Sequence, residues 1–203
     1  MILSAKLVPT RRSPRNGFSL VELVLSLAVL LVITTLAIPL VVRSLQNYQL
    51  NSTASQLAGM LKFAKFDAIR QNTKVSCQIK WNASGSNWLV WVDSNGNGQP
   101  DGAEPQMIIG GSFTLISGGV PNTAPITTTL GPGFSGYSWM VLSGSTTSIT
   151  YDQRGVIDAM AVYVLYLGNP SDPNSGYRAI ITMPSGAVQV WTASSGGNWQ
   201  RVS

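Results

Sequence analysis

The sequence predicts an α+β protein in which one long N-terminal helix, transmembrane over its first half, packs on an antiparallel β-sheet head. An early apolar run continues without a turn signal into an amphipathic helical pattern, and the remaining residues form short stretches rich in β-branched and aromatic side chains. The composition agrees: 44% of the 203 residues are hydrophobic and only 10% are charged, against about 25% charged in average soluble domains. This length suits one domain with an additional element.

The apolar run covers residues 18–42, and Glu22 is its only charge. At about 1.5 Å per residue, a helix of this length crosses a hydrocarbon core of about 30 Å. Four basic residues precede the run and only Arg43 follows closely, so the positive-inside rule places the N-terminus in the cytoplasm and the head outside it. The four are Lys6, Arg11, Arg12 and Arg15. The run is too long for a secretory signal peptide, whereas a plain membrane anchor remains an alternative.

Residues 43–72 are predicted to form the soluble, amphipathic half of the same helix. Leu57, Leu61, Ala64 and Ala68 recur at steps of four, three and four, which places them on one helical face. Charged residues occupy the other faces; they include Lys62, Lys65, Asp67 and Arg70. We therefore expect the apolar stripe to face the sheet.

A proline, Pro39, lies inside the predicted helix. Proline removes one backbone hydrogen bond and crowds the carbonyl four residues earlier. A kink or a melted turn is therefore expected near Thr35. The proline also suits the membrane exit, and the two interpretations are compatible.

Residues 73–203 predict a β-rich head. Turn-forming residues separate short candidate strands, which favours one antiparallel sheet or a pair of sheets. The candidate strands are 74–81, 87–92, 106–116, 137–142, 147–151, 159–167, 177–183 and 187–192. The stretch 117–136, rich in Gly and Pro, predicts a surface loop. The only cysteine, Cys77, lies in an alternating stretch and is interpreted as a small buried hydrophobe.

Composition excludes several classes of function. The chain has no histidine and one cysteine, so histidine-dependent nucleophilic catalysis and the usual zinc sites are excluded. An enzyme would need a carboxylate pair, and Asp152 with Asp158 is the only close pair outside the acidic loop discussed below. From Phe18 onward 9 basic residues face 8 acidic ones, a net charge of +1. Nucleic acid is therefore an unexpected partner, since affinity grows with the number of phosphates neutralised.

The N-terminal stretch RRSPRNGFSLVELVLSLAVLLVITTLAIP resembles the signal of type IV prepilins and pseudopilins. The resemblance implies a leader of residues 1–17, cleavage between Gly17 and Phe18 by a prepilin peptidase, and N-methylation of Phe18. It also implies that Glu22 pairs with the new amine of Phe18 on a neighbouring subunit. Such a pairing agrees with physical chemistry, because an unpartnered carboxylate in the membrane costs several kcal/mol.

The rest of the chain resembles GspH/FimT-type pseudopilins and minor pilins, and so implies a pilin-like fold. The resemblance rests on the end of the helix, on a Trp- and Val-rich strand that enters an Asp/Asn-rich loop, on Tyr151 to Gly155, and on a late glycine turn at Gly186. Some relatives that take up DNA have a Gly-Arg-x-Arg element at that turn. Both arginines are missing here, where Ala187 and Gln189 stand, and only Arg178 and Arg201 could add charge nearby.

An acidic loop follows the second candidate strand. Residues 93–104 read DSNGNGQPDGAE and match the twelve-residue calcium-loop template D-x-[DN]-x-[DN]-G-x5-E at every position. The oxygen ligands would be Asp93, Asn95, Asn97, the carbonyl of Gln99, Asp101 and Glu104. The flanking segments are predicted to be strands, whereas an EF-hand loop lies between helices. A metal-free hairpin loop is therefore the favoured interpretation, and a calcium-binding loop is the alternative. No other cofactor is expected.

These observations predict a structural subunit, a minor pilin or pseudopilin, in a type IV pilus or a type II secretion pseudopilus. Expected partners are other pilin or pseudopilin subunits, the prepilin peptidase, the inner-membrane assembly platform and the lipid bilayer. The expected location is the bacterial inner membrane, crossed once with the head in the periplasm, and then the filament. The alternative is a DNA- or ligand-binding minor pilin of a competence or adhesion pilus.

Overall fold

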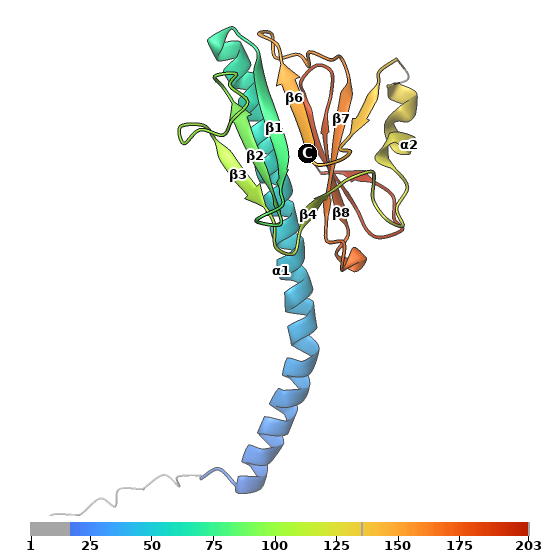
Figure 1. Ribbon diagram of the computed structural model, residues 1–203. Coiled ribbons are helices and arrows are strands. Elements are labelled where there is room, and N and C mark those ends of the chain that lie inside the picture. The colour runs from blue at the N-terminus through green and yellow to red at the C-terminus, as the bar shows by residue number, and fades with distance from the viewer. Residues whose placement is uncertain (1–16, 135, 203) are drawn as a thin grey trace, which may run out of the picture. The chain divides into compact units, whose positions relative to one another are not determined.

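The structure, a computed structural model, describes residues 17–134 and 136–202. Most of the predicted leader, with its four basic residues, lies outside the described residues. The chain divides into two compact units, one ending at Val42 and the other running from Arg43 to Ser203. The predicted fold class is confirmed: one long N-terminal helix precedes a head of mainly antiparallel sheets (Figure 1).

Helix α1 (Leu20–Gln71) runs unbroken through Pro39. A melted turn at Thr35 is therefore not observed, while the kink stays a prediction. The helix ends where the sequence predicted. Asn72 adopts a left-handed conformation with φ of 51°, and the Thr73 N–H donates to the Ala68 carbonyl at 3.2 Å. Such a left-handed residue satisfies carbonyls at a helix end that would otherwise lack partners.

The predicted apolar stripe of α1 is confirmed. Leu57, Leu61, Ala64 and Ala68 are all 0% exposed, and the stripe extends back to Leu50. The expectation for Asp67 was wrong, because this residue is 3% exposed and belongs to the buried face. Its position three residues after Ala64 places it beside the stripe, where other residues donate hydrogen bonds to it.

Four antiparallel strands form the first sheet, in the order β3-β2-β1-β6. The strands are β1 (Val75–Asn82), β2 (Asn87–Asp93), β3 (Gln106–Ile109) and β6 (Thr146–Tyr151). The β1–β2 hairpin closes on the pair Asn82 and Asn87, and Cys77 opposite Val92 lies within its register. The acidic loop connects β2 to β3 in this sheet.

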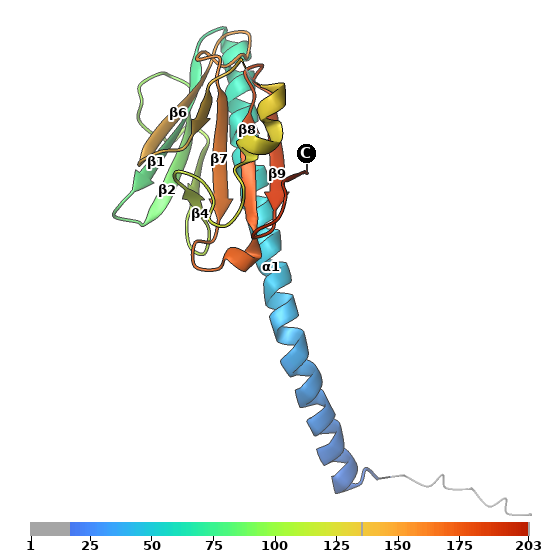
Figure 2. The same cartoon turned by 90° about the vertical axis from the view of Figure 1, so that its right-hand side faces the viewer.

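A second sheet holds six strands, in the order β10-β9-β8-β7-β4, with β5 added beside β7. The strands are β4 (Thr114–Ile116), β5 (Trp139–Val141), β7 (Val162–Gly168), β8 (Tyr177–Thr182), β9 (Val188–Ala193) and β10 (Gln200–Arg201). All pairs are antiparallel except β5 with β7, which is parallel. Figure 2 shows the strands of both sheets from a second side.

Several predicted boundaries were wrong. The single strand expected over 106–116 is two strands in different sheets, because the chain turns at Gly110 and Gly111, the latter with φ of 79°. The strand expected over 137–142 is the three-residue β5, and the strand expected from Ala159 begins at Val162. The short β10 was not predicted.

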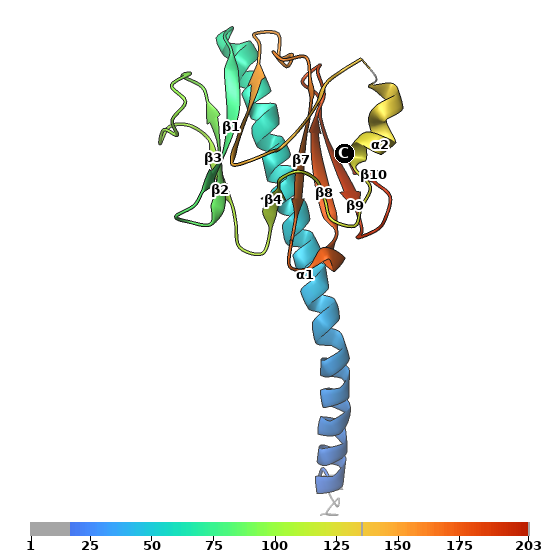
Figure 3. The same ribbon diagram turned by 45° about the vertical axis from the view of Figure 1, so that its right-hand side comes forward.

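The stretch 117–136 is more than a loop. This stretch contains the short helix α2 (Ile126–Leu130) and the 3-10 turn η1 (Gly131–Gly133). Elsewhere in the chain, a second 3-10 turn, η2 (Pro173–Ser175), precedes β8. Ile126 is fully buried, and its N–H donates to the Tyr166 hydroxyl at 3.1 Å. This contact holds α2 against the second sheet (Figure 3).

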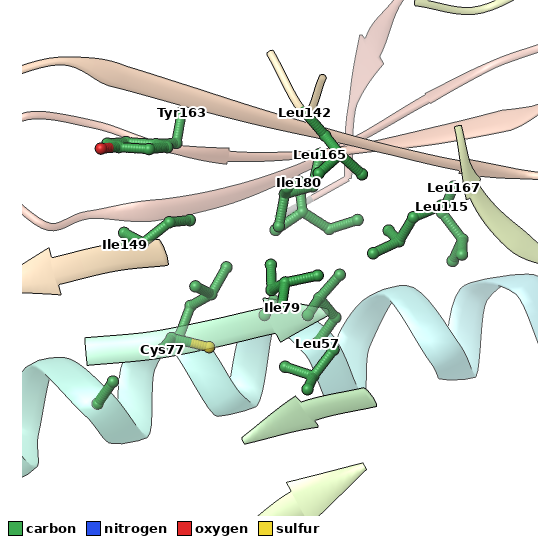
Figure 4. Close-up of a cluster of buried hydrophobic side chains, with 14 of the residues drawn as sticks. Leu57, Cys77, Ile79, Leu115, Leu142, Ile149, Tyr163, Leu165, Leu167 and Ile180 are labelled. Carbon is green, nitrogen blue, oxygen red and sulfur yellow. The ribbon is translucent and has the colours of Figure 1, made fainter. Parts of the chain in front are cut away.

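Two apolar clusters stabilise the head. The first joins α1 to both sheets: Leu57 lies with Cys77 and Ile79 of β1 and with Leu165 and Ile180 of the second sheet (Figure 4). The second cluster lies on the opposite face of the second sheet, under α2 and its connections. Alternate residues of β7 serve the two clusters, so both faces of this sheet are buried.

Candidate functional site

The predicted processing motif stands at the start of α1. Gly17 and Phe18 precede the helix, Phe18 is 76% exposed, and the Leu23 N–H donates to the Ser19 carbonyl at 3.1 Å. A side chain on Gly17 would meet nothing within 4 Å. No contact within the described chain therefore requires glycine at this position. Glu22 lies in the first helical turn, where a negative charge is favoured by the helix dipole.

The residues that follow the motif form an apolar surface. The large apolar side chains of residues 18–42 are all about half exposed or more, from 48% at Val42 to 79% at Leu20. This is the one helix in the described chain that is long and apolar enough to span a membrane, judged by length and composition. Water solvates such a surface poorly, so it is suited to lipid or to other apolar helices.

The acidic loop begins with a buried carboxylate. Asp93, the last residue of β2, is 3% exposed. Its Oδ2 accepts a hydrogen bond from the Gly98 N–H at 3.0 Å, so the carboxylate faces the inside of the loop. Its Oδ1 is buried and has no hydrogen-bond partner among the described residues. Gly98, which the template places at the sharp turn, has φ of 72°.

The other predicted ligands converge on the same loop. The Glu104 carboxylate accepts the N–H of Ser94 at 2.9 Å and that of Asp101 at 3.2 Å, which brings the two ends of the loop together. The Asn95 and Asn97 side-chain amides donate to Asp101 Oδ2 at 2.6 and 3.0 Å. Within the described residues, no three acidic or cysteine side chains form a group that could hold a metal by themselves.

One buried residue that sequence reasoning missed connects this loop to α1. Asp67 accepts hydrogen bonds from Ser94 Oγ at 2.6 Å, from Gln71 Nε2 at 2.7 Å and from Arg70 Nε at 3.1 Å. Burial by itself raises the pKa of Asp67, but the bonds from Ser94, Arg70 and Gln71 outweigh it, and the net pKa is lower than usual. The helical spacing from Ala64 could have predicted that Asp67 is buried.

Two of the glycines singled out in the sequence lie against each other. Gly155 and Gly186 have φ of 76° and 72°, and a Cβ on Gly186 would collide with the carbonyl oxygen of Gly155. The side chain of Lys65 packs against both turns, and its Nζ donates to the Ser185 carbonyl at 3.1 Å. These glycines therefore fix where the turn after β6 and the turn between β8 and β9 meet each other and the side chain of Lys65.

The carboxylates considered for catalysis are used in separate contacts. Asp152 accepts the N–H groups of Val156 and Arg154, both at 2.9 Å, and closes its own turn. The Val156 N–H and the bonds from Arg154 lower the pKa of Asp152. Asp158 forms an exposed ion pair with Lys74 at 3.0 Å. Each aspartate is therefore used in a local structural contact of its own.

Comparison with known proteins decides the family. The family model described as "Type II transport protein GspH" matches residues 53–186, which include most of the head and about the last third of α1. The chain belongs to the GspH family. A second pattern, described as a prokaryotic N-terminal methylation motif, matches residues 12–38. The predicted resemblance to type IV pilin-like proteins is thereby confirmed.

Two individual proteins resemble this GspH-family chain. The pilin-like protein PilA1 of Thermus thermophilus is 37% identical over 90 residues, which are 44% of this chain and 56% of PilA1. The chain thus spans little more than half of that relative. The solved type IV minor pilin FimU of Pseudomonas aeruginosa is 15% identical, with a TM-score of 0.46 over 72% of this chain and 99% of FimU.

Arg178 and Cys77, which were singled out in the sequence, are both buried in this GspH-family chain. Arg178 is 6% exposed; its Nε donates to Asn51 Oδ1 of α1 at 2.6 Å, and its Nη1 donates to the Tyr177 carbonyl at 2.9 Å. It therefore cannot contribute to a basic surface for DNA. Cys77 is 0% exposed, as predicted, and burial raises the pKa of its thiol to about 12. The thiol is accordingly unreactive at neutral pH.

Proposed function

We propose that this chain is a minor structural subunit of a filament, either a type IV pilus or a type II secretion pseudopilus. One observation supports the proposal above all others. The match to the N-terminal methylation motif, residues 12–38, includes most of an exposed apolar helical segment whose single acid is Glu22. The membership in the GspH family is consistent with this role.

In the proposed pathway, a prepilin peptidase cuts between Gly17 and Phe18 and the new amine of Phe18 is methylated. The helix is held in the inner membrane as a single span, with its start on the cytoplasmic side, because the basic residues cluster ahead of Phe18. An assembly platform then moves the subunit into the filament, where the helices of neighbouring subunits replace lipid around it.

Glu22 has a defined part in this assembly. Within lipid its carboxylate is costly unless a cation neutralises it. The free amine of Phe18 on the next subunit is such a cation, and it exists only after the leader has been removed. Cleavage thus creates the partner that Glu22 needs, which makes assembly dependent on processing.

Two measurements on the native filament system test the proposal. Mass spectrometry of the membrane-bound protein should show loss of residues 1–17 and addition of one methyl group. The variant Glu22→Ala should be processed but absent from sheared filaments. Ser26→Ala, one turn further along, provides the matched control and should assemble normally, because among the described residues Ser26 Oγ bonds only the carbonyl of Leu23 in its own helix.

An uncut precursor in the wild type would overturn the proposed processing. Normal incorporation of Glu22→Ala would overturn the proposed pairing. We do not propose DNA capture by the head, since the net charge after the leader is low and Arg178 lies inside the protein.

A further inference from the structure

We propose that the acidic loop between β2 and β3, residues 93–104, binds one calcium ion. The twelve residues match the calcium-loop template at every position, and the structure adds an observation that the template does not contain. Asp93 Oδ1 is a buried carboxylate oxygen without a hydrogen-bond partner in the described chain. The inference does not depend on the filament role.

The orientation of Asp93 identifies the kind of partner it needs. One oxygen, Oδ2, accepts the Gly98 N–H, which fixes the carboxylate facing into the loop. Leaving the other oxygen buried and unpaired is unfavourable, because it has lost its water without gaining a donor. No Lys or Arg forms an ion pair with Asp93 among the described residues. A cation inside the loop would satisfy this oxygen.

The remaining ligands are oxygens on the same short segment. The side-chain oxygens of Asn95 and Asn97 accept the N–H groups of Asn97 and Gln99, at 2.9 and 2.7 Å, and each keeps a second lone pair. Glu104 bonds both ends of the loop through two different oxygens, which also keep free lone pairs. The hydrogen bonds that shape the loop can therefore persist when an ion binds.

The ligand set favours calcium over other ions. It consists of three carboxylates, two amides and the carbonyl of Gln99, and it contains no nitrogen or sulfur ligand that zinc would prefer. The carboxylates alone do not form a ready metal cluster, so the amides and the carbonyl must complete the coordination. Calcium accepts six to eight oxygens in flexible geometry, whereas magnesium requires a small, near-ideal octahedron.

Binding would also affect how the loop is held on the helix. Ser94 lies between Asp93 and Asn95 in the loop, and its Oγ donates to Asp67 of α1. An ion that orders the loop therefore also orders Ser94 and its bond to Asp67. We expect calcium to stabilise the whole head and not only the hairpin.

Terbium, a luminescent substitute for calcium, gives a direct test on the full-length chain in detergent micelles. Trp91 lines a hollow of about 260 Å³ together with Gly98 and Gln99 of the loop, so it should transfer excitation to a bound terbium ion. Calcium should displace terbium from the wild type. Asp93→Asn should weaken terbium binding at least tenfold, and Asp158→Asn, which removes an acid from a different surface contact, should leave it unchanged.

Thermal unfolding provides the second readout. Extracellular calcium modules commonly have a Kd of about 0.1 to 1 mM. At about 5 mM calcium, Tm should therefore rise by roughly 2 to 9 °C relative to chelator. Asp93→Asn should show no rise, and in chelator it should unfold no earlier than the wild type, because it lacks the buried unpaired charge. Should this variant fail to fold, Glu104→Gln provides the same comparison.

Three results would overturn the proposal. They are an unchanged Tm of the wild type in calcium, unchanged terbium binding by the Asp93→Asn and Glu104→Gln variants, and an equal rise of Tm with magnesium. The last result would keep a cation site but refute the assignment to calcium.

Discussion

Replacing Asp67 by alanine should destabilise the head far more than replacing an exposed charged residue, because Asp67 lies on the buried face of α1. The Asp67 side chain is 2% exposed and accepts bonds from Ser94, Gln71 and Arg70. A hydrogen bond to a charged group contributes about 1.5 to 3 kcal/mol. The Arg70 side chain is 75% exposed and regains water when its partner is removed. We therefore expect a net loss of about 2 kcal/mol rather than the sum of three bonds.

The matched control is Asp158→Ala. Asp158 is also an aspartate paired with a basic side chain, but the side chains of Lys74 and Asp158 are 64% and 45% exposed. Exposed ion pairs of this kind contribute about 0 to 1 kcal/mol. In a chain of this size about 1 kcal/mol corresponds to 2 to 4 °C. Asp67→Ala should accordingly lower Tm by roughly 4 to 8 °C, and Asp158→Ala by less than about 4 °C.

Circular dichroism of both variants at pH 7, in chelator, measures the difference without any contribution from bound metal. Equal Tm values for the two variants would refute the reasoning, because burial would then add nothing to the stability that Asp67 contributes. A second check is the denaturant midpoint, which should move in the same order without a change in its slope.

Three further outcomes follow from the same structure. Because the pKa of Asp67 is lowered in the folded chain, its contribution to stability is present above its ordinary pKa of 3.8 and is lost as the pH falls through the lowered pKa. The Tm gap between wild type and Asp67→Ala should therefore stay constant from about pH 5 to 7 and narrow as the pH falls below about 4. Gly186→Ala should unfold at much lower temperature than Gly118→Ala, because both glycines have positive φ but only Gly186 has a neighbouring carbonyl where the methyl would stand; equal effects would show that backbone conformation alone matters. Cys77, with its buried thiol, should resist iodoacetamide at pH 8 and react only after denaturation, and labelling of the folded chain would contradict the packing of the first cluster.

Much of this fold could be predicted because its elements follow local patterns. The four-residue and three-residue steps from Leu57 to Ala68 predicted the buried face of α1, and the alternation around Cys77 predicted β1. In both cases one face of the element packs against the core, and the spacing of apolar residues along the sequence shows which face this is.

The elements that were missed depend on distant contacts. Helix α2 has the sequence ITTTL, which disfavours an isolated helix, and it is held by burial of Ile126 and by the Tyr166 hydroxyl. The division of 106–116 into two strands results from the glycine pair at 110–111 and from the separate partners of β3 and β4. Neither partner can be identified from the local sequence.

In the candidate site, the sequence predicted the ligand types but not their environment. The template predicted that Asp93 begins the loop, yet only the structure shows that one of its oxygens is buried without a partner. The role of Asp67 was missed for the same reason, because a charged residue beside an apolar stripe is assigned to solvent unless its partners are known.

The first apolar cluster has a consequence for mechanical load on the subunit. Residues from Leu50 to Ala68 of α1 share this cluster with strands of both sheets, and no separate core exists between the two sheets in the described part of the chain. A pull along the second half of α1 is therefore resisted by side chains from both sheets at once. Detaching that half would expose the interior of the head, so undocking and unfolding should occur as one event.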